Sequence, residues 1–170
     1  MGVAVRDPDG KLVLLTGNQT GSLMAWYRVT THFQLGLLDD TNRNRAVLVK
    51  TFVTSGLQDE IATRNGLPVT NTLTGFKWIG GKQLKYERLL PPDIQANYRS
   101  FSVAEARAAH LQHGRYYVFG GEESYGYLGA DFVRDKDGNM AVLMFVELAA
   151  LAASQGRTVA ALLDDVSAEY

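Results

Sequence analysis

The sequence contains no cysteine and no long apolar run, and these two absences narrow the classes of protein to which it can belong. Without cysteine there is no disulfide scaffold, no cysteine-based zinc site and no thiol nucleophile. No stretch approaches the roughly 18 uncharged apolar residues that cross a membrane. The first ten residues, MGVAVRDPDG, lack the basic region followed by an apolar run that marks a secretory signal. We therefore expect a cytoplasmic protein without a membrane partner.

The sequence also lacks an excess of charge of either sign. It has 17 Lys and Arg against 18 Asp and Glu, a net charge of −1. Proteins that bind mainly the phosphate backbone of nucleic acids carry a basic excess, so we expect no nucleic-acid partner. Hydrophobic residues at 46% and charged residues at 21% are typical of a folded globular chain. The length of 170 residues suits one domain, or one domain with a piece of another.

Two β-favouring runs, residues 2–6 and 11–15, open the chain and are joined by the sequence DPDG. Carboxylates two residues apart can share a hard cation, so Asp7 and Asp9 allow a metal interpretation. The Pro and Gly of the same segment favour instead a hairpin turn, in which Asp side chains accept bonds from backbone amides. An isolated hairpin is marginally stable in water, so we expect this one to pack on the rest of the chain.

The remainder alternates between helix and strand patterns. A strand, a helix and a second strand in succession form a β-α-β unit, which predicts a sheet with helices on both faces. We therefore expect a three-layer α/β/α domain with a mixed sheet of about four strands, preceded by a β-hairpin. The expected helices cover 17–38, 55–65, 74–90, 103–112, 139–154 and 158–170, the expected strands cover 46–53, 67–73 and 115–120, and residues 91–101 are expected to be a loop.

The most unusual segment is the glycine-rich loop GGEESYG, residues 120–126, directly after an apolar strand. Ligands bind at the carboxyl ends of strands in open α/β sheets, and glycine lets the backbone approach a ligand closely. The carboxylates of Glu122 and Glu123 together with the Ser124 hydroxyl suit the neighbouring hydroxyls of a sugar, because a carboxylate accepts two O–H bonds. The alternative is that Glu122 and Glu123 are solvated loop charges. A glycosidase-like carboxylate pair is disfavoured, because adjacent residues of an extended chain point in opposite directions.

Two further segments have a composition that suits ligand binding. In RDKDG, residues 134–138, Lys136 is either a surface lysine paired with the neighbouring aspartates or a partner for a phosphate or hydroxyl group. Thr74 and Gly75 lie between a strand and a helix, where backbone amides are available to an anion. Each segment alone is a weak signal. Along the chain the motifs read LTGFKWIG, GGEESYGYL and DFVRDKDG.

In this order these motifs closely resemble the third domain of the α-D-phosphohexomutases, the phosphoglucomutase and phosphomannomutase family, and the resemblance covers nearly the whole chain. It implies that residues 17–170 are the sugar-recognition domain, third of four in the family, and that residues 1–16 are a hairpin remnant of the preceding metal-loop domain. Family members interconvert 1-phospho and 6-phospho hexoses. A phosphoserine donates the phosphoryl group, a glucose 1,6-bisphosphate-type intermediate forms, and Mg²⁺ is required.

The resemblance also implies a role for each matched residue. Glu122 and Ser124 would bond the ring hydroxyls, Thr74 and Gly75 would contact the substrate, and Lys136 would lie near the reacting phosphate with a charge or proton role. The phosphoserine loop, the magnesium loop and the phosphate-binding domain of the family do not occur in this sequence. We therefore expect no metal ligands, no catalytic residue acting alone and no mutase activity from this chain by itself.

The partners implied are a hexose phosphate, of glucose or mannose, and the other domains of the same parent chain. The alternative hypothesis is a free-standing sugar-phosphate binding or regulatory module that performs no catalysis.

Overall fold

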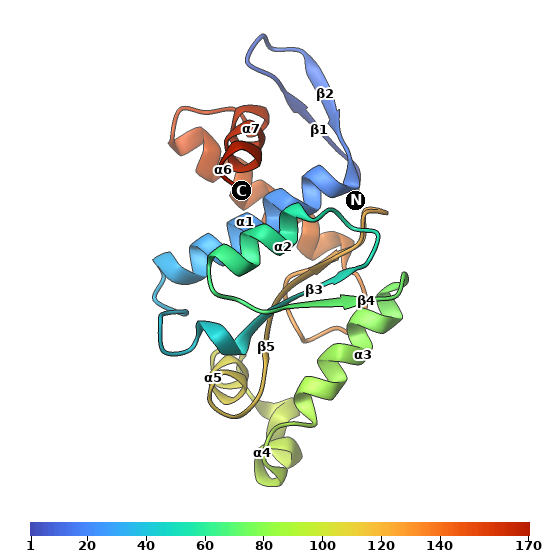
Figure 1. The fold of residues 1–170 in the computed structure, drawn as a ribbon, viewed down its shortest axis with the longest axis vertical. Helices are drawn as coiled ribbons and strands as arrows, with labels where there is room; N and C mark the ends of the chain where they lie inside the picture. Colours follow the sequence, from blue (N-terminus) through green and yellow to red (C-terminus); the bar gives the residue numbers. More distant parts are fainter.

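The computed structural model describes residues 1–170, and the helices and strands that were predicted occur in the predicted order, together with further short elements (Figure 1). The strands are β1 (Val3–Arg6), β2 (Leu12–Leu15), β3 (Ala46–Thr51), β4 (Val69–Thr72), β5 (Tyr116–Gly121) and β6 (Tyr127–Leu128). The α-helices are α1 (Gly17–Gln34), α2 (Leu57–Arg64), α3 (Phe76–Glu87), α4 (Pro92–Asn97), α5 (Val103–His113), α6 (Gly138–Ser154) and α7 (Val159–Glu169). Two short 3₁₀ helices are η1 (Arg43–Arg45) and η2 (Tyr98–Ser100).

Four of the strands form one mixed sheet in the order β4-β3-β5-β6. β3 pairs in parallel with both β4 and β5, whereas β6 runs antiparallel to β5. The prediction of a mixed sheet of about four strands is confirmed. The hydrophobic pattern did not locate β6, because two residues are too few to show the alternation of a strand.

Helices cover both faces of this sheet, which confirms the three-layer architecture. Ala46 and Leu48 of β3 pack in the larger core with α1, α2, α6 and α7. The alternate residues Val47 and Val49 face the other way, toward Phe76 at the start of α3. Figure 1 shows α1 and α2 on one side of the strands and α3 on the other.

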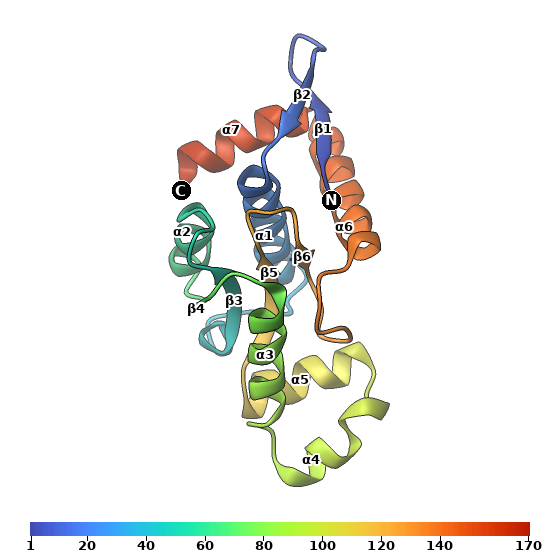
Figure 2. The same ribbon diagram turned by 90° about the vertical axis from the view of Figure 1, so that its right-hand side faces the viewer.

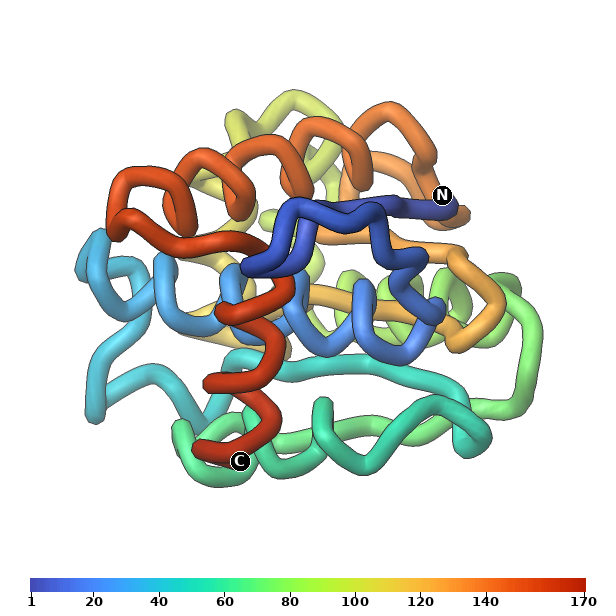
Figure 3. Tube along the Cα trace, turned by 90° about the horizontal axis from the view of Figure 1, so that it is seen from above, coloured from blue at the N-terminus to red at the C-terminus, as the bar shows by residue number.

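The N-terminal hairpin packs on the larger core and projects from one end of the molecule (Figure 2). Val5 and Leu15 are buried in this core, while Leu12 and Leu14 on the opposite face are exposed. Figure 3 shows the hairpin and α7 on the same side of α1. In the turn, the Asp7 carboxylate accepts the Lys11 N–H at 2.8 Å, which is the turn role expected for it. The division of the chain at residue 16 stays a prediction.

Two element predictions were wrong. The first helix ends at Gln34 rather than at residue 38, because Gly36 adopts a φ of +64° that ends the helical path. Residues 91–101 are not a plain loop but contain α4 and η2. α3 ends earlier, at Glu87, and Pro92 favours the first turn of α4, since its fixed φ is already helical.

No single helix has the length and apolar composition of a membrane span, and α6 with α7 reaches them only as a pair bent by 90°.

Candidate functional site

The predicted site residues lie at the edge of the sheet where β3, β4 and β5 end. Because these strands are parallel, their carboxyl ends point the same way, and the segments that follow them gather at one edge. These segments are the turn after β3, residues 52–56, the turn Leu73–Gly75 before α3, and the loop Glu122–Gly126 between β5 and β6. Ligand-binding sites of open α/β sheets commonly form at this edge.

Glu122 directly connects two of these segments. Its side chain is buried, and its Oε1 accepts the backbone N–H of Gly75 at 2.7 Å. Gly75 is the N-cap of α3 and has a φ of +112°, a conformation that side chains disfavour. The positive end of the α3 dipole therefore lies beside the Glu122 carboxylate and stabilises its charge. Residues 47 positions apart in the sequence are thus bonded at the predicted site.

Lys136 lies beside the same carboxylate. Its segment precedes α6, where Asp137 caps the helix by accepting the Met140 N–H at 3.0 Å. A Cβ placed on Gly126 would lie 2.9 Å from Lys136 Cδ and 3.0 Å from Glu122 Oε2, so both side chains converge on this glycine. The Lys136 ammonium is exposed, 4.0 Å from the Asp135 carboxylate. An exposed pair at that distance contributes little stability and leaves the charge available to a ligand.

The other two predicted residues present hydroxyl groups to solvent. Ser124 and Thr74 are both exposed, and neither side chain forms a hydrogen bond within the protein. Ser124 belongs to the same loop as Glu122, and Thr74 precedes Gly75. The structure thus brings Glu122, Gly75 and Lys136 into one cluster, with the hydroxyls of Ser124 and Thr74 on the adjoining turns.

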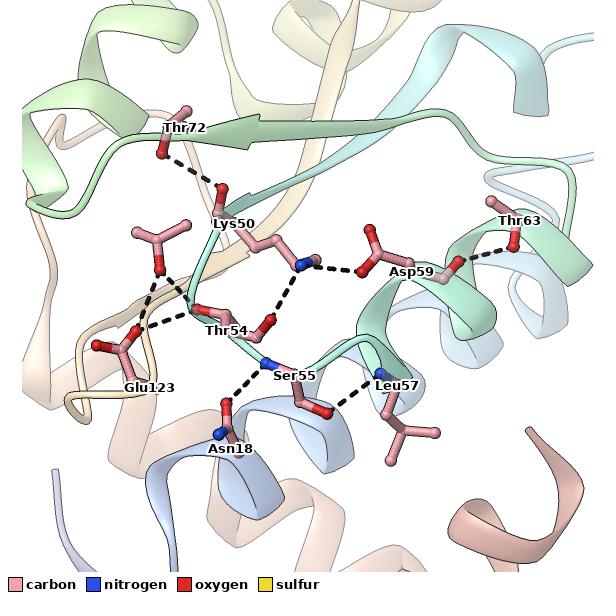
Figure 4. Close-up of polar contacts among 10 residues, drawn as sticks. Asn18, Lys50, Thr54, Ser55, Leu57, Asp59, Thr63, Thr72 and Glu123 are labelled. Atoms are coloured by element: carbon pink, nitrogen blue, oxygen red, sulfur yellow. Dashed lines mark hydrogen bonds and ion pairs between the residues drawn. The ribbon is translucent and has the colours of Figure 1, made fainter.

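Glu123 has a different environment from Glu122. Its Oε2 accepts hydrogen bonds from the hydroxyls of Thr51 and Thr54 at 3.1 and 3.3 Å (Figure 4). The idea that Glu123 is a plain solvated loop charge is therefore wrong. The two adjacent carboxylates point to different neighbours, one toward α3 and the other toward the turn after β3.

A buried lysine supports that turn, and the sequence reasoning missed it. Lys50 is only 3% exposed, forms an ion pair with Asp59 at 2.9 Å and donates to the carbonyl of Thr54 at 3.1 Å. The available signal was the run AVLVKT, in which a lysine and a threonine end an otherwise apolar strand. A lysine is almost never fully buried without a partner, so that pattern predicts a paired charge at a strand end.

The residues present do not fit a magnesium site. No group of three or more His, Asp or Glu side chains is arranged to hold a metal ion. The Asp7 carboxylate bonds the backbone of its own turn. No metal-dependent step is therefore assigned to this chain.

A separate surface groove of about 580 Å³ runs between β4 and the outer face of α3. Its lining includes Leu73, Lys77, Trp78, Lys82 and Lys85. None of the predicted site residues lines it, although Leu73 is adjacent to Thr74. The groove is thus a second concave surface next to the predicted site.

The chain matches the family model "Phosphoglucomutase/phosphomannomutase, alpha/beta/alpha domain III" over residues 16–90 and 102–170. It belongs to this family, as the order of its motifs predicted. The unmatched residues 91–101 contain α4, η2 and the residues flanking them.

Individual relatives are also sugar-phosphate mutases by name. The chain is 30% identical over 167 residues to a phosphoglucomutase of Staphylococcus epidermidis, covering 98% of this chain and 24% of that protein. It is 28% identical over 171 residues to the phosphopentomutase of Mus musculus, covering 100% of this chain and 23% of that protein. The chain thus spans about a quarter of the length of these curated relatives.

A solved structure supports the fold. A protein of Thermus thermophilus, assigned as a phosphomannomutase, superimposes with a TM-score of 0.60 at 24% identity. The match covers 98% of this chain and 30% of that one.

Proposed function

We propose that this chain is the sugar-recognition domain of a phosphohexomutase. In the intact enzyme it binds the hydroxyls of a hexose phosphate, of glucose or mannose, while a phosphoryl group moves between the 1 and 6 positions. The observation that carries the proposal is the convergence of Glu122, Gly75 and Lys136 at the carboxyl edge of the sheet. These residues belong to the three motifs that mark the family in the sequence.

The geometry suggests a distinct role for each group. Glu122 Oε1 bonds Gly75, whereas Oε2 accepts no hydrogen bond within the chain and is available to a sugar hydroxyl. The Ser124 hydroxyl can donate to, or accept from, a neighbouring hydroxyl of the same sugar. The Lys136 side chain converges with Glu122 on Gly126, and its exposed ammonium supplies positive charge for the phosphate. Thr74 and Gly75, beside Glu122 at the start of α3, supply the further substrate contact.

We infer that the remaining catalytic parts belong to other domains of the same parent chain. Phosphoryl transfer requires a nucleophile, a metal ion and a phosphate clamp in one arrangement. The phosphoserine, Mg²⁺ and the binding of a glucose 1,6-bisphosphate-type intermediate are therefore expected from the intact enzyme. With glucose 1-phosphate, the bisphosphate and Mg²⁺ supplied, this chain alone should form no glucose 6-phosphate.

A binding titration tests the sugar role directly. Backbone amide NMR spectra recorded with increasing glucose 1-phosphate or mannose 1-phosphate give an affinity and a map of the affected residues. Glu122→Gln keeps an oxygen for the Gly75 N–H but replaces the second oxygen by a donor. Losing a charged acceptor costs about 1–3 kcal/mol, so the affinity should fall about 5- to 150-fold.

The matched control is Asp164→Ala, which removes an exposed carboxylate on α7 and should leave the affinity unchanged. The sugar role is wrong if Glu122→Gln binds as tightly as the unaltered protein. It is also wrong if the ligand shifts no amide of the Glu122–Gly126 loop.

A further inference from the structure

We propose that Glu123 is a positioning residue, which holds the loop Glu122–Gly126 in its ligand-binding shape by accepting hydrogen bonds from Thr51 and Thr54. The inference rests on the proposed function, since the shape matters because Glu122 and Ser124 belong to this loop. Glu123 is assigned no contact with the sugar. It acts through the backbone that it anchors.

The first observation is that the loop is tied to two separate parts of the fold. Glu122 bonds the N–H of Gly75 at the start of α3, and Glu123 bonds the two threonine hydroxyls beyond β3. Figure 4 shows the second of these connections, with the Glu123 carboxylate directed at the turn that carries Thr54. Because the two side chains form hydrogen bonds with different parts of the fold, the backbone that carries them is fixed in orientation as well as in position.

The second observation concerns the number of protons available. Thr51 and Thr54 are buried, and their hydroxyl oxygens are 2.7 Å apart. Only two hydroxyl protons are shared among these three close contacts, so at least one of the two threonines donates to Glu123 whichever way the hydroxyls are oriented. Either arrangement needs an acceptor at the Glu123 position. Without it, a buried hydroxyl would lose its hydrogen bond, which is unfavourable.

The third observation is that the turn after β3, which carries Thr54, is itself held in place. Lys50 donates to the Thr54 carbonyl and pairs with Asp59 of α2. On the other side, Asn18 of α1 accepts the Ser55 N–H at 2.9 Å. The turn that receives Glu123 is therefore fixed to two helices, and it can hold the loop in place.

The fourth observation is that the loop needs such support. Tyr125 has a φ of +66° and is the only residue other than glycine with a positive φ in the chain. A strained conformation of this kind persists only when the surrounding structure enforces it. The hydrogen bonds of Glu122 and Glu123, three and two residues before Tyr125, are in the right place to do so.

Hydrogen exchange provides a test that does not depend on ligand binding. Two amides report on the loop: Glu122 N–H, bonded to the Gly126 carbonyl, and Gly75 N–H, bonded to Glu122. Leu48 N–H of β3, bonded to Pro68, reports on the sheet. In Glu123→Ala the two loop amides should exchange at least 10-fold faster, while Leu48 is unchanged.

Two further variants separate positioning from general stability. Glu123→Gln retains an oxygen acceptor and should restore slow exchange of the loop amides. Thr54→Val keeps the shape of the side chain but removes one donor, and should give an intermediate exchange rate even if Glu123→Ala folds poorly. Asp164→Ala is the control for loss of an exposed carboxylate, and should match the unaltered protein.

The affinity for glucose 1-phosphate completes the test, with a fall of at least 5-fold expected in Glu123→Ala and recovery in Glu123→Gln. Equal loop exchange in Glu123→Ala and the unaltered protein would overturn the proposal, as would equal acceleration of Leu48. Faster loop exchange with unchanged affinity would also overturn it. If the unaltered protein binds no sugar phosphate, the proposed function fails, while the exchange data still decide whether Glu123 positions the loop.

Discussion

The start of α1 lies so close to the Glu122–Gly126 loop that only glycine fits at position 17. A Cβ built on Gly17 would be 1.7 Å from the carbonyl oxygen of Glu123 and 3.2 Å from the backbone nitrogen of Tyr125. The colliding atoms are backbone, so no side-chain rotation relieves the contact. A normal contact between a methyl carbon and an oxygen is about 3.3 Å long. In Gly17→Ala the loop or the helix must therefore move apart by more than about 1 Å to reach that distance. The bond from the Tyr127 hydroxyl to the Gly17 carbonyl, 2.8 Å long, would be disturbed as well.

The expected cost can be worked out from two opposing effects. Forced displacement in a well-packed region costs about 1–3 kcal/mol, and a contact this short belongs at the upper end of that range. Alanine is favoured over glycine inside a helix by at most about 1 kcal/mol, and less at the first helical position. The free energy of unfolding should therefore fall by about 2 kcal/mol in Gly17→Ala.

Gly81→Ala provides a matched control, because Gly81 is also helical but a Cβ there would meet nothing within 4 Å. It should raise the free energy of unfolding by about 0.5–1 kcal/mol. Urea unfolding followed by circular dichroism measures both variants. A Gly17→Ala protein as stable as Gly81→Ala would refute the close packing of α1 on the loop.

Three other predictions address pH, the site and a helix cap. Burial lowers the pKa of His32 to about 4, so as pH falls the unfolded chain takes up the proton first, and about 3 kcal/mol of stability should be lost between about pH 6.5 and 4. Urea unfolding of His32→Gln should show a shallower dependence of the free energy of unfolding on pH. An equal slope would show that His32 is not the group responsible. Gly126→Ala places a Cβ against Lys136 and Glu122, so it should weaken glucose 1-phosphate binding at least 5-fold in an NMR titration. The control Gly138→Ala adds a Cβ where nothing lies within 4 Å, and it should leave the affinity unchanged. Ser102→Ala removes the side-chain cap of α5 and should lower the free energy of unfolding by about 1 kcal/mol, measured by urea unfolding; no change would show that the cap is dispensable.

Features of the fold that depend on local sequence were predictable. Ser102 and Glu105 form a capping box, which a serine followed three residues later by a glutamate favours, and the DPDG turn closes the hairpin. At the start of α1, Thr16 is the N-cap, and Asn18 accepts the Ser55 N–H. Thr16 forms a capping box with Gln19 three residues further on, so the local sequence itself favours Thr16 as the cap.

Features that depend on distant contacts were not predictable from pattern alone. The Glu123–Thr51 bond joins residues 72 positions apart, and neither residue carries a local signal for the other. Burial of Lys50 likewise depends on Asp59 being held by α2 against the end of β3. For the candidate site, the motifs identified which residues to examine, but only the fold shows that Glu122 reaches Gly75 rather than solvent.

A crystal structure of this chain with glucose 1-phosphate tests the central claim most directly. The sugar should lie at the carboxyl edge of the sheet, with ring hydroxyls within hydrogen-bonding distance of Glu122 and Ser124 and the Lys136 ammonium directed toward the ligand. A sugar seated in the groove of Lys77, Trp78 and Lys82, with no contact to Glu122, would contradict the claim.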